Sequence, residues 1–387
     1  MIRAFGLTMA PVLLLWLMAG LTPCEPQSGG YLIALSIISL AQLAPALSLS
    51  AAGRLRHFQV TSDWLSFQLA VLAFTGACLL AADRYQRGLL IAVSPALLRD
   101  AWVASASDSW SILSATGNLL LGFAPWALTV AALERRPSKM ALGLAALAVL
   151  TFSFINGGRS AMLVALGLPV TGVLLFASPD RLRKAIACMC AAAMLALLGA
   201  AAVFAARAER SGAESQEFLL TLARHLGGEW MGAPPQGAVA WIMACNLYLL
   251  HSVWTFADLL MGTLTPEGQA AGVMWASIAG RFLAIEIPPN GLGGRFLPLI
   301  GCLAHDFGAW LGTASWVSFW FGASTLSRRW IQWAPVPLLI TLFGSIALLA
   351  PMMNPVDLSI MPATVLCFVP TVLLLTWHSS FRTTPTS

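Results

Sequence analysis

The stretch that decides the fold runs from Met140 to Ala177 and reads MALGLAALAVLTFSFI, then NGGRS, then AMLVALGLPVTGVLLFA. Each apolar run, 140–155 and 161–177, comes close to the length that a helix needs to cross the hydrocarbon of a bilayer. Only residues 156–160 join the two runs, which leaves room for a tight turn and no real loop. The pattern therefore predicts a helical hairpin in a membrane, with Arg159 at or just inside the membrane edge.

Arg159 is the charged residue of this turn. A guanidinium group at the edge of a bilayer costs several kcal/mol unless an anion or water meets it. Gly157 and Gly158 let the backbone turn tightly and leave space beside the side chain, and Ser160 is a good N-cap for the following helix. A fork-shaped cation next to a helix N-terminus suits a phosphate group, so we expect Arg159 to bind one.

The whole chain is as apolar as this hairpin. Its 387 residues are 58% hydrophobic and only 10% charged, and the mean hydropathy is +0.80. These values exclude an ordinary soluble domain, and the continuous rather than alternating apolar runs exclude a membrane barrel. We expect an all-α polytopic membrane protein in which residues 1–387 form a single integral membrane domain.

Apolar runs predict about 12 transmembrane helices. The weakest run is 270–287, because it contains Arg281 and Glu286, so ten helices and a re-entrant region remain the alternative. The runs are 5–21, 31–49, 64–82, 112–133, 140–155, 161–177, 185–206, 238–257, 270–287, 296–326, 335–350 and 360–377.

Basic residues set the predicted orientation. With the N-terminus in the cytoplasm, twelve of the 21 Lys and Arg residues, including both lysines, fall in cytoplasmic segments. Because cytoplasmic loops carry the excess of basic residues, we predict an N-in, C-in topology. The large polar segment 207–236 then lies outside and holds a surface helix whose apolar face includes Phe218 and Leu222. A second, irregular outer region spans 264–296.

The remaining basic residues, all assigned to the outer side, are without exception arginines. Arginine binds phosphate oxygens bidentately whereas lysine is a hydrated point charge, so this face suggests recognition of an anion. A general coding preference for arginine explains the composition equally well, but it does not put Arg159 and Arg281 inside or beside apolar runs. The outer arginines are Arg84, Arg87, Arg99, Arg159, Arg207, Arg210, Arg224, Arg281 and Arg295.

A second group of candidates lies in the run 296–326. Gly301, His305, Gly308 and Gly312 share one face of a continuous helix, which permits close helix packing and leaves space beside the histidine. His305 and Asp306 are candidates for a general base, although neighbours on a helix point about 100° apart and are not expected to pair easily. The alternative is a packing face whose polar members bond to neighbouring helices.

These motifs, in this order, resemble those of the Wzy-type polymerases of O-antigen or oligosaccharide repeat units. The resemblance rests on GGRS (157–160) opening an apolar helix, and on an outer loop entered through Arg207 and Arg210. It also rests on Pro298 followed by DFG (306–308) and Gly312. It covers the overall plan and roughly residues 130–325.

The resemblance implies a glycosyltransferase of the bacterial inner membrane, related in architecture to the O-antigen ligases, that needs no metal or other cofactor. Such enzymes polymerise repeat units carried on undecaprenyl diphosphate at the periplasmic face, in lipopolysaccharide or other polysaccharide biosynthesis. Its partners would be a lipid-linked donor, a lipid-linked acceptor, membrane lipid and a chain-length regulator protein, with no nucleic acid.

The resemblance also implies roles for residues. Arg159 would hold the diphosphate, with help from Arg207 and Arg210, and Arg281 and Arg295 complete the proposed diphosphate-binding set. Guanidinium groups can stabilise the charge that develops on the leaving diphosphate without a metal ion. The candidates for the base that receives the proton of the acceptor hydroxyl are His305, Asp306, Glu229 and His225. His305 is the nearest match to the histidine of the ligases.

Two other functions stay open at this point. An O-antigen ligase, which transfers the glycan to a lipid A-core acceptor, shares most of these features. A lipid-linked glycan flippase or secondary transporter is the non-enzyme alternative, and broken helices with paired intramembrane charges would favour it.

Overall fold

The computed structural model describes most of the chain. It leaves out residues 1, 27–28, 52–56, 61–63, 89–110, 135, 137, 157–159, 179–180, 184–185, 188–193, 195–196, 199–200, 203, 207, 210–211, 265–269, 271–274, 276–296, 331–335, 356–359, 378–380 and 385–387. The predicted runs 185–206 and 270–287 therefore fall largely outside the described residues.

The described part is mostly helical, and its helices are those of an all-α membrane protein. Five segments are long and apolar enough to cross a membrane, and four shorter apolar segments accompany them. The long segments are α1 (Ile2–Leu21), α2 (Tyr31–Ala51), α3 (Leu65–Gln86), α5 (Ile112–Leu121) with α6 (Phe123–Leu133), and α11 (Gly237–Leu260). The shorter ones are α7 (Lys139–Asn156), α8 (Ser160–Phe176), α14 (Val336–Leu349), and α15 (Met361–Leu366) with α16 (Phe368–Trp377).

The chain divides into two compact units. Unit 1 comprises residues 1–51, 182–326 and 347–354, and unit 2 comprises residues 52–181, 327–346 and 355–387. Each unit is made of three separate stretches of the chain, so the chain passes between the units more than once.

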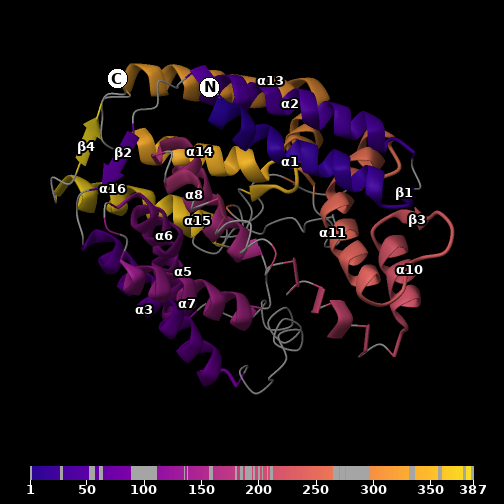
Figure 1. Ribbon diagram of the computed structural model, residues 1–387, viewed down its shortest axis with the longest axis horizontal. Coiled ribbons are helices and arrows are strands. Elements are labelled where there is room, and N and C mark those ends of the chain that lie inside the picture. Colours follow the sequence, from indigo (N-terminus) through magenta and orange to yellow (C-terminus); the bar gives the residue numbers. More distant parts are fainter. Residues whose placement is uncertain are drawn as a thin grey trace. The chain divides into compact units, whose positions relative to one another are not determined.

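Unit 2 is built around α3, which packs against α5, α6 and α7, while α8 packs against α6 (Figure 1). The start of α3 lies beside the end of α6, because Ser66 donates to the Glu134 carboxylate. The end of α3 lies beside the start of α5, because Ser111 donates to Asp83. The two runs are therefore antiparallel, and α7 and α8 continue the alternation. The end of α7 and the start of α8 therefore lie at the same end of this group as Asp83.

Glu134 organises the opposite end of unit 2. Its carboxylate is fully buried and accepts from the backbone N–H of Ser66 at 3.2 Å and from the Ser66 hydroxyl at 2.8 Å. It thereby caps α3, whose N-cap residue Trp64 offers no capping side chain. The carbonyl oxygen of Glu134 accepts from Arg181 Nη1 at 2.7 Å, which ties the end of α8 to the same place.

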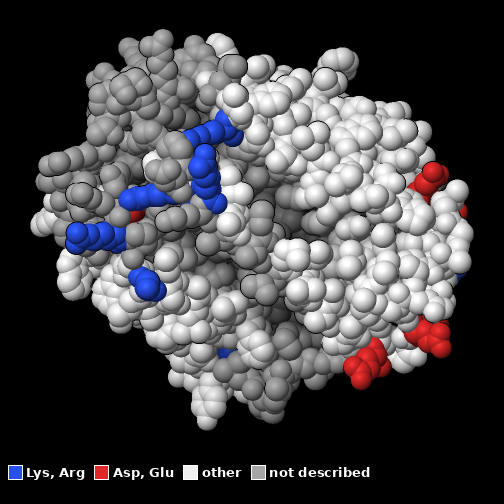
Figure 2. All heavy atoms as spheres, in the orientation of Figure 1, with Lys and Arg blue, Asp and Glu red and all other residues white. Residues whose placement is uncertain are grey.

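Two short strands lie at this end as well. β2 (His57–Val60) pairs antiparallel with β4 (Phe381–Thr384), and Val60 forms a parallel bridge with Glu134. Figure 2 shows basic side chains gathered in the part of the view where Figure 1 places β2 and α16. The connections that begin near residues 57 and 134, and the C-terminal tail, therefore meet on one side of unit 2.

Unit 1 joins the α1–α2 turn to the polar segment 207–236. β1 (Cys24–Pro26), between α1 and α2, pairs antiparallel with β3 (Gly228–Trp230), which sets Glu25 opposite Glu229 (Figure 1). Met231 N–H also donates to the Pro23 carbonyl at 2.8 Å. Acidic side chains lie around β1 and α10 (Ser215–His225) in Figure 2. The two segments predicted to be outside are thus in direct contact.

Helix α10 lies where the apolar spacing predicts a helix, and its apolar face packs against α11. The rings of Phe218 and Trp241 are 5.8 Å apart, and Leu219 and Ala223 are buried. Arg224 and His225 lie on the exposed side. Residues of the apolar face of α10 are therefore buried against α11.

In unit 1, polar side chains donate hydrogen bonds to carbonyl groups that lack a backbone donor because a proline lies four residues later. Pro45 lies inside α2 and has no N–H to offer to the carbonyl of Ala41, four residues earlier. The indole Nε1 of Trp316 donates to that carbonyl at 2.8 Å. The buried Gln42 likewise donates to the carbonyl of Ala347, four residues before Pro351, at 2.5 Å.

Candidate functional site

The candidate site of unit 1 lies on α13 (Leu299–Trp330), which turns a corner at Gly308. Gly308 has φ 77° and ψ 158°, a backbone conformation that only glycine adopts readily. Beyond the corner, Gly312 packs onto the chain before it, and a Cβ atom there would lie 2.5 Å from the carbonyl oxygen of Leu303. α13 is therefore two helices, and the second folds back toward the first.

This corner corrects two predictions. The run 296–326 is not one continuous helix, and positions 301, 305, 308 and 312 do not share one face, because Gly308 leaves helical geometry between them. The small size of Gly312 does permit a close approach, but the approach is between the two parts of α13 itself. A glycine inside an apolar run is compatible with either outcome, so sequence spacing alone does not distinguish them.

His305 and Asp306 sit just before the corner and form a pair. His305 Nδ1 lies 2.6 Å from Asp306 Oδ1, and the two side chains are 14% and 11% exposed. The expectation that these neighbours would not easily pair is wrong. Their Cβ atoms diverge, but Nδ1 and Oδ1 each lie two bonds beyond Cβ and reach back toward each other. Asp306 Oδ1 also accepts from the Ala270 N–H at 2.8 Å, which holds the carboxylate in place.

The geometry gives this pair a chemical capacity. A carboxylate on Nδ1 fixes the tautomer and the orientation of the imidazole ring, which is the arrangement of a histidine general base acting through Nε2. The pair is largely buried in a membrane protein, where ionisable side chains are costly and tend to be functional. Within the described residues, no three His, Cys, Asp or Glu side chains come together as a metal-binding group.

The other two candidate bases lie elsewhere in unit 1. His225 is the last residue of α10, and Glu229 is the middle residue of β3. Both are exposed. Glu229 lies opposite Glu25 in the β1–β3 pair, whereas His305 and Asp306 lie at the corner of α13. The four candidates thus form two groups, one exposed and one largely buried.

The arginines proposed to bind the diphosphate, Arg159, Arg207, Arg210, Arg281 and Arg295, all lie outside the described residues. Among the described residues, the end of α7 at Asn156 and the start of α8 at Ser160 flank the GGR part of the GGRS motif.

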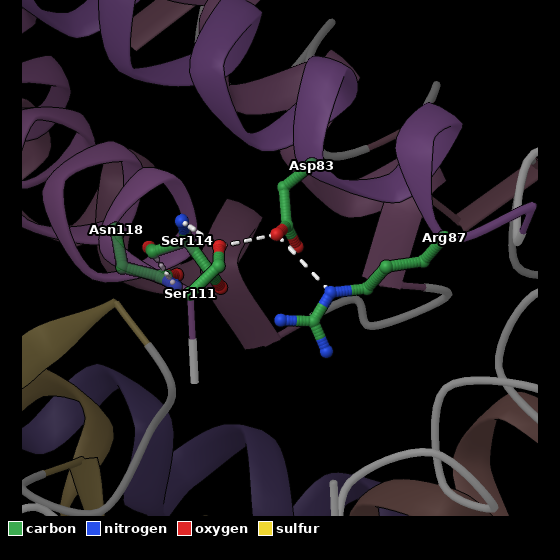
Figure 3. Close-up of polar contacts among 5 residues, drawn as sticks. All are labelled: Asp83, Arg87, Ser111, Ser114 and Asn118. Atoms are coloured by element: carbon green, nitrogen blue, oxygen red, sulfur yellow. Dashed lines mark hydrogen bonds and ion pairs between the residues drawn. The ribbon is translucent and has the colours of Figure 1, made fainter. Parts of the chain in front are cut away.

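A polar cluster at the Asp83 end of unit 2 belongs to no sequence motif (Figure 3). Asp83, near the end of α3, is 2% exposed. Its Oδ1 accepts from Arg87 Nε at 3.1 Å and from the Ser111 hydroxyl. Ser111 is also the N-cap of α5 and accepts from the Ser114 N–H at 3.0 Å. The one sequence signal that marks the cluster is an acidic residue in the last turn of an apolar run.

Comparison with known proteins adds no assignment: no protein-family model, no curated protein and no solved structure matches the chain.

Proposed function

We propose that the chain is a metal-independent glycosyltransferase that polymerises oligosaccharide repeat units carried on undecaprenyl diphosphate into O-antigen or another surface polysaccharide. The observation that carries the proposal is the largely buried His305–Asp306 pair, joined at 2.6 Å beside the Gly308 corner. Transfer of a sugar to a hydroxyl group needs a base at the acceptor, and this pair has the form of one.

The proposal includes a topology of about 12 transmembrane helices, N-in and C-in, in the bacterial inner membrane. Contacts among the described residues support it. β2, Glu134, Arg181 and β4, which belong to segments assigned to the cytoplasm, contact one another in unit 2. β1 and β3, assigned to the periplasm, are paired in unit 1. An odd number of membrane crossings between the members of either set would separate them.

In the proposed reaction, the acceptor hydroxyl gives its proton to His305 while its oxygen attacks the anomeric carbon of the donor sugar. The bond between that carbon and the diphosphate oxygen breaks, and the electron pair leaves with undecaprenyl diphosphate. Asp306 holds the imidazole and stabilises the imidazolium that forms. Arg159, Arg207, Arg210, Arg281 and Arg295 would stabilise the charge on the leaving group.

A transporter or flippase is the second candidate, and one observation favours it. Helices broken near mid-membrane with polar groups at the break are typical of secondary transporters. α13 is broken at Gly308, and His305 and Asp306 lie directly before the break. An O-antigen ligase would use the same chemistry as the polymerase and would differ in its acceptor.

The test uses the purified full chain in nanodiscs with a synthetic repeat unit on undecaprenyl diphosphate, chelator present and nucleotide absent. We expect longer glycans that remain attached to undecaprenyl diphosphate. His305→Ala should lower the rate by about 100-fold or more, the usual contribution of a general base. Glu217→Gln, on the exposed side of α10, should leave the rate unchanged.

Other outcomes would separate the alternatives. Transfer of the glycan only to lipid A-core would identify a ligase. A chain that elongates none of a panel of repeat units, yet moves a fluorescent lipid-linked glycan across the bilayer, would overturn the polymerase proposal in favour of transport.

A further inference from the structure

Three exposed cations lie at the Glu134 end of unit 2. Arg136 follows α6, Lys139 is the first residue of α7, and Arg183 follows α8. Within the part of the chain that the structure describes, none of the three takes part in a hydrogen bond or an ion pair. Figure 2 shows basic side chains gathered where Figure 1 places β2, the strand that contacts Glu134. We call Arg136, Lys139 and Arg183 the basic surface.

One hydrogen bond brings these cations to the same place. Arg181 Nη1 donates to the Glu134 carbonyl at 2.7 Å, which joins the segment after α8 to the segment after α6. Arg183 is two residues from Arg181, and Arg136 is two residues from Glu134. Since two residues span at most about 7 Å, both arginines start close to this contact, and α7 begins only three residues after Arg136. The basic surface is therefore set by the fold, although its members are distant in sequence.

The charge of the basic surface is not balanced by its own segments. Residues 134–139 and 180–184 include six basic and two acidic side chains. One of the two acids, Glu134, is fully buried and accepts from Ser66, so it does not meet the exposed cations. Lys139 stands at the N-terminus of α7, where the helix dipole disfavours a cation and favours an anion. The basic surface is thus better suited to bind an anion than to stabilise its own helix.

An exposed apolar stripe leads from the basic surface along α7. Its members share one helical face and are all exposed: Met140, Leu147, Leu150 and Phe154. The stripe begins beside Lys139 and covers about 21 Å of helix, whereas one leaflet of hydrocarbon is about 15 Å thick. A cation at the head of such a stripe matches a phospholipid, with a phosphate at one end and an acyl chain beyond it. A nucleic acid or an acidic protein would use the cations and leave the stripe uncovered.

We infer that the basic surface binds an anionic phospholipid, whose headgroup phosphate lies on Arg136, Lys139 and Arg183 and whose acyl chain lies along the α7 stripe. Basic side chains at a membrane surface attract anionic headgroups through their charge. A neutral phospholipid lacks the net charge that this surface selects. The binding site does not rest on the proposed function, whereas its place in the cytoplasmic leaflet rests on the proposed topology.

The first experiment titrates the purified full chain in neutral detergent with dioctanoyl phosphatidylglycerol and follows bound lipid by native mass spectrometry. Dioctanoyl phosphatidylcholine, which has the same acyl chains and no net charge, is the comparison probe, and we expect it to bind at least fivefold more weakly. A variant that combines Arg136→Gln, Lys139→Gln and Arg183→Gln should weaken phosphatidylglycerol binding at least 10-fold. The same variant should change phosphatidylcholine binding less than twofold.

Matched variants separate binding from folding. Arg224→Gln removes a positive charge from an exposed position on α10 and should bind phosphatidylglycerol like the wild type. The combined Arg136→Lys and Arg183→Lys variant keeps the charge and should also bind like the wild type, because the attraction depends on charge. If the triple variant does not fold, Lys139→Gln alone supplies the test and should weaken phosphatidylglycerol at least twofold. Its side chain is exposed, so this change removes no buried contact.

Competition tests whether the occupant is a lipid. Glycerol 3-phosphate, which has the phosphate and no acyl chain, should compete with dioctanoyl phosphatidylglycerol at least 10-fold more weakly than that lipid competes with itself. Equal competition would show a site for soluble phosphate and overturn the assignment to a lipid. Tighter binding of a thymidine decanucleotide than of phosphatidylglycerol, lost in the triple variant, would assign the surface to nucleic acid and overturn it as well.

The binding titration also stands apart from the elongation assay. A chain that does not elongate repeat units but binds phosphatidylglycerol through the basic surface retains the lipid site and loses the proposed function. Equal affinity of the wild type and the triple variant for phosphatidylglycerol would overturn the lipid site while the proposed function stands.

Discussion

Gly76 of α3 packs directly on the backbone of Gly117 of α5. A Cβ atom at Gly76 would lie 2.7 Å from the carbonyl oxygen of Gly117, and one at Gly117 would lie 2.9 Å from the carbonyl oxygen of Gly76. Because the helices are antiparallel, this contact fixes their register about two turns away, where Asp83 meets Ser111. Two side chains of minimal size therefore position a charged cluster that neither of them touches.

Gly117→Ala should lower the free energy of unfolding by about 1 to 3 kcal/mol, because the added methyl group overlaps backbone atoms of α3 that cannot move independently. Gly143→Ala, in the second turn of α7, is the matched control, since a Cβ atom there meets nothing within 4 Å. That change should be neutral or stabilise the helix by about 0.5 to 1 kcal/mol. Thermal unfolding in detergent measures both, and equal shifts for the two variants would contradict the proposed register contact.

Trp316 and Pro45 should be coupled through the carbonyl of Ala41. Trp316→Phe removes the indole donor to that half-buried carbonyl and should cost about 1 to 3 kcal/mol. In a Pro45→Ala background, the new N–H of residue 45 can donate to Ala41 as in an ordinary helix, so the same change should cost less. A double-mutant cycle on the free energy of unfolding isolates the coupling, expected at about 0.5 to 2 kcal/mol. Additive effects of the two substitutions would show that the indole N–H does not replace the helical donor.

The apolar runs predict most of the helices well because helix position follows length and hydropathy. The runs 140–155 and 161–177 correspond to α7 (Lys139–Asn156) and α8 (Ser160–Phe176). The corner at Gly308 escapes such reasoning, since glycine in an apolar run fits a continuous helix as well as a break. Its conformation depends on Gly312 meeting Leu303, a tertiary contact.

The candidate site was predictable to a smaller extent. His305 and Asp306 stand out as ionisable residues in an apolar run, but their pairing depends on side-chain torsions that spacing does not determine. Asp83 is paired with Ser111 across 28 positions, through a register set by two glycines. Glu134 reads as part of a polar turn, yet it is fully buried as the cap of α3. In each case a partner distant in sequence decides the role.

Gly312→Ala should open the corner of α13. The added Cβ atom would lie 2.5 Å from the Leu303 carbonyl oxygen, so the two parts of α13 must separate and His305 must move with the first part. We expect a loss of about 1 to 3 kcal/mol in the free energy of unfolding. If the proposed function holds, the elongation rate should also fall. Gly322→Ala, further along α13 with nothing within 4 Å of its Cβ position, is the control and should change neither quantity. An unaltered Gly312→Ala variant would mean that the corner does not depend on this contact.

Cys24 should make the protein less stable as the pH rises above about 9. Burial raises the pKa of the Cys24 thiol to about 12, and the carboxylates of Glu229 and Glu25 add to the effect. Cys24 is 7% exposed and lies in β1, outside the membrane-spanning helices. The pKa of the folded state thus lies above the unfolded value near 9.0, so the neutral thiol favours the folded state. That contribution is complete below pH 9 and is lost as the pH rises toward 12, at about 1.4 kcal/mol per pH unit at most.

Unfolding of the wild type and of Cys24→Ala, compared between pH 8 and pH 10.5, measures the difference, because the other groups that titrate there are common to both. The wild type should lose more stability than the variant over this range, and Glu229→Gln should reduce the difference only slightly, since burial is the larger cause. Identical pH dependence in the wild type and Cys24→Ala would show that the thiol is not buried beside Gly228 and Trp254 as the β1–β3 pairing requires.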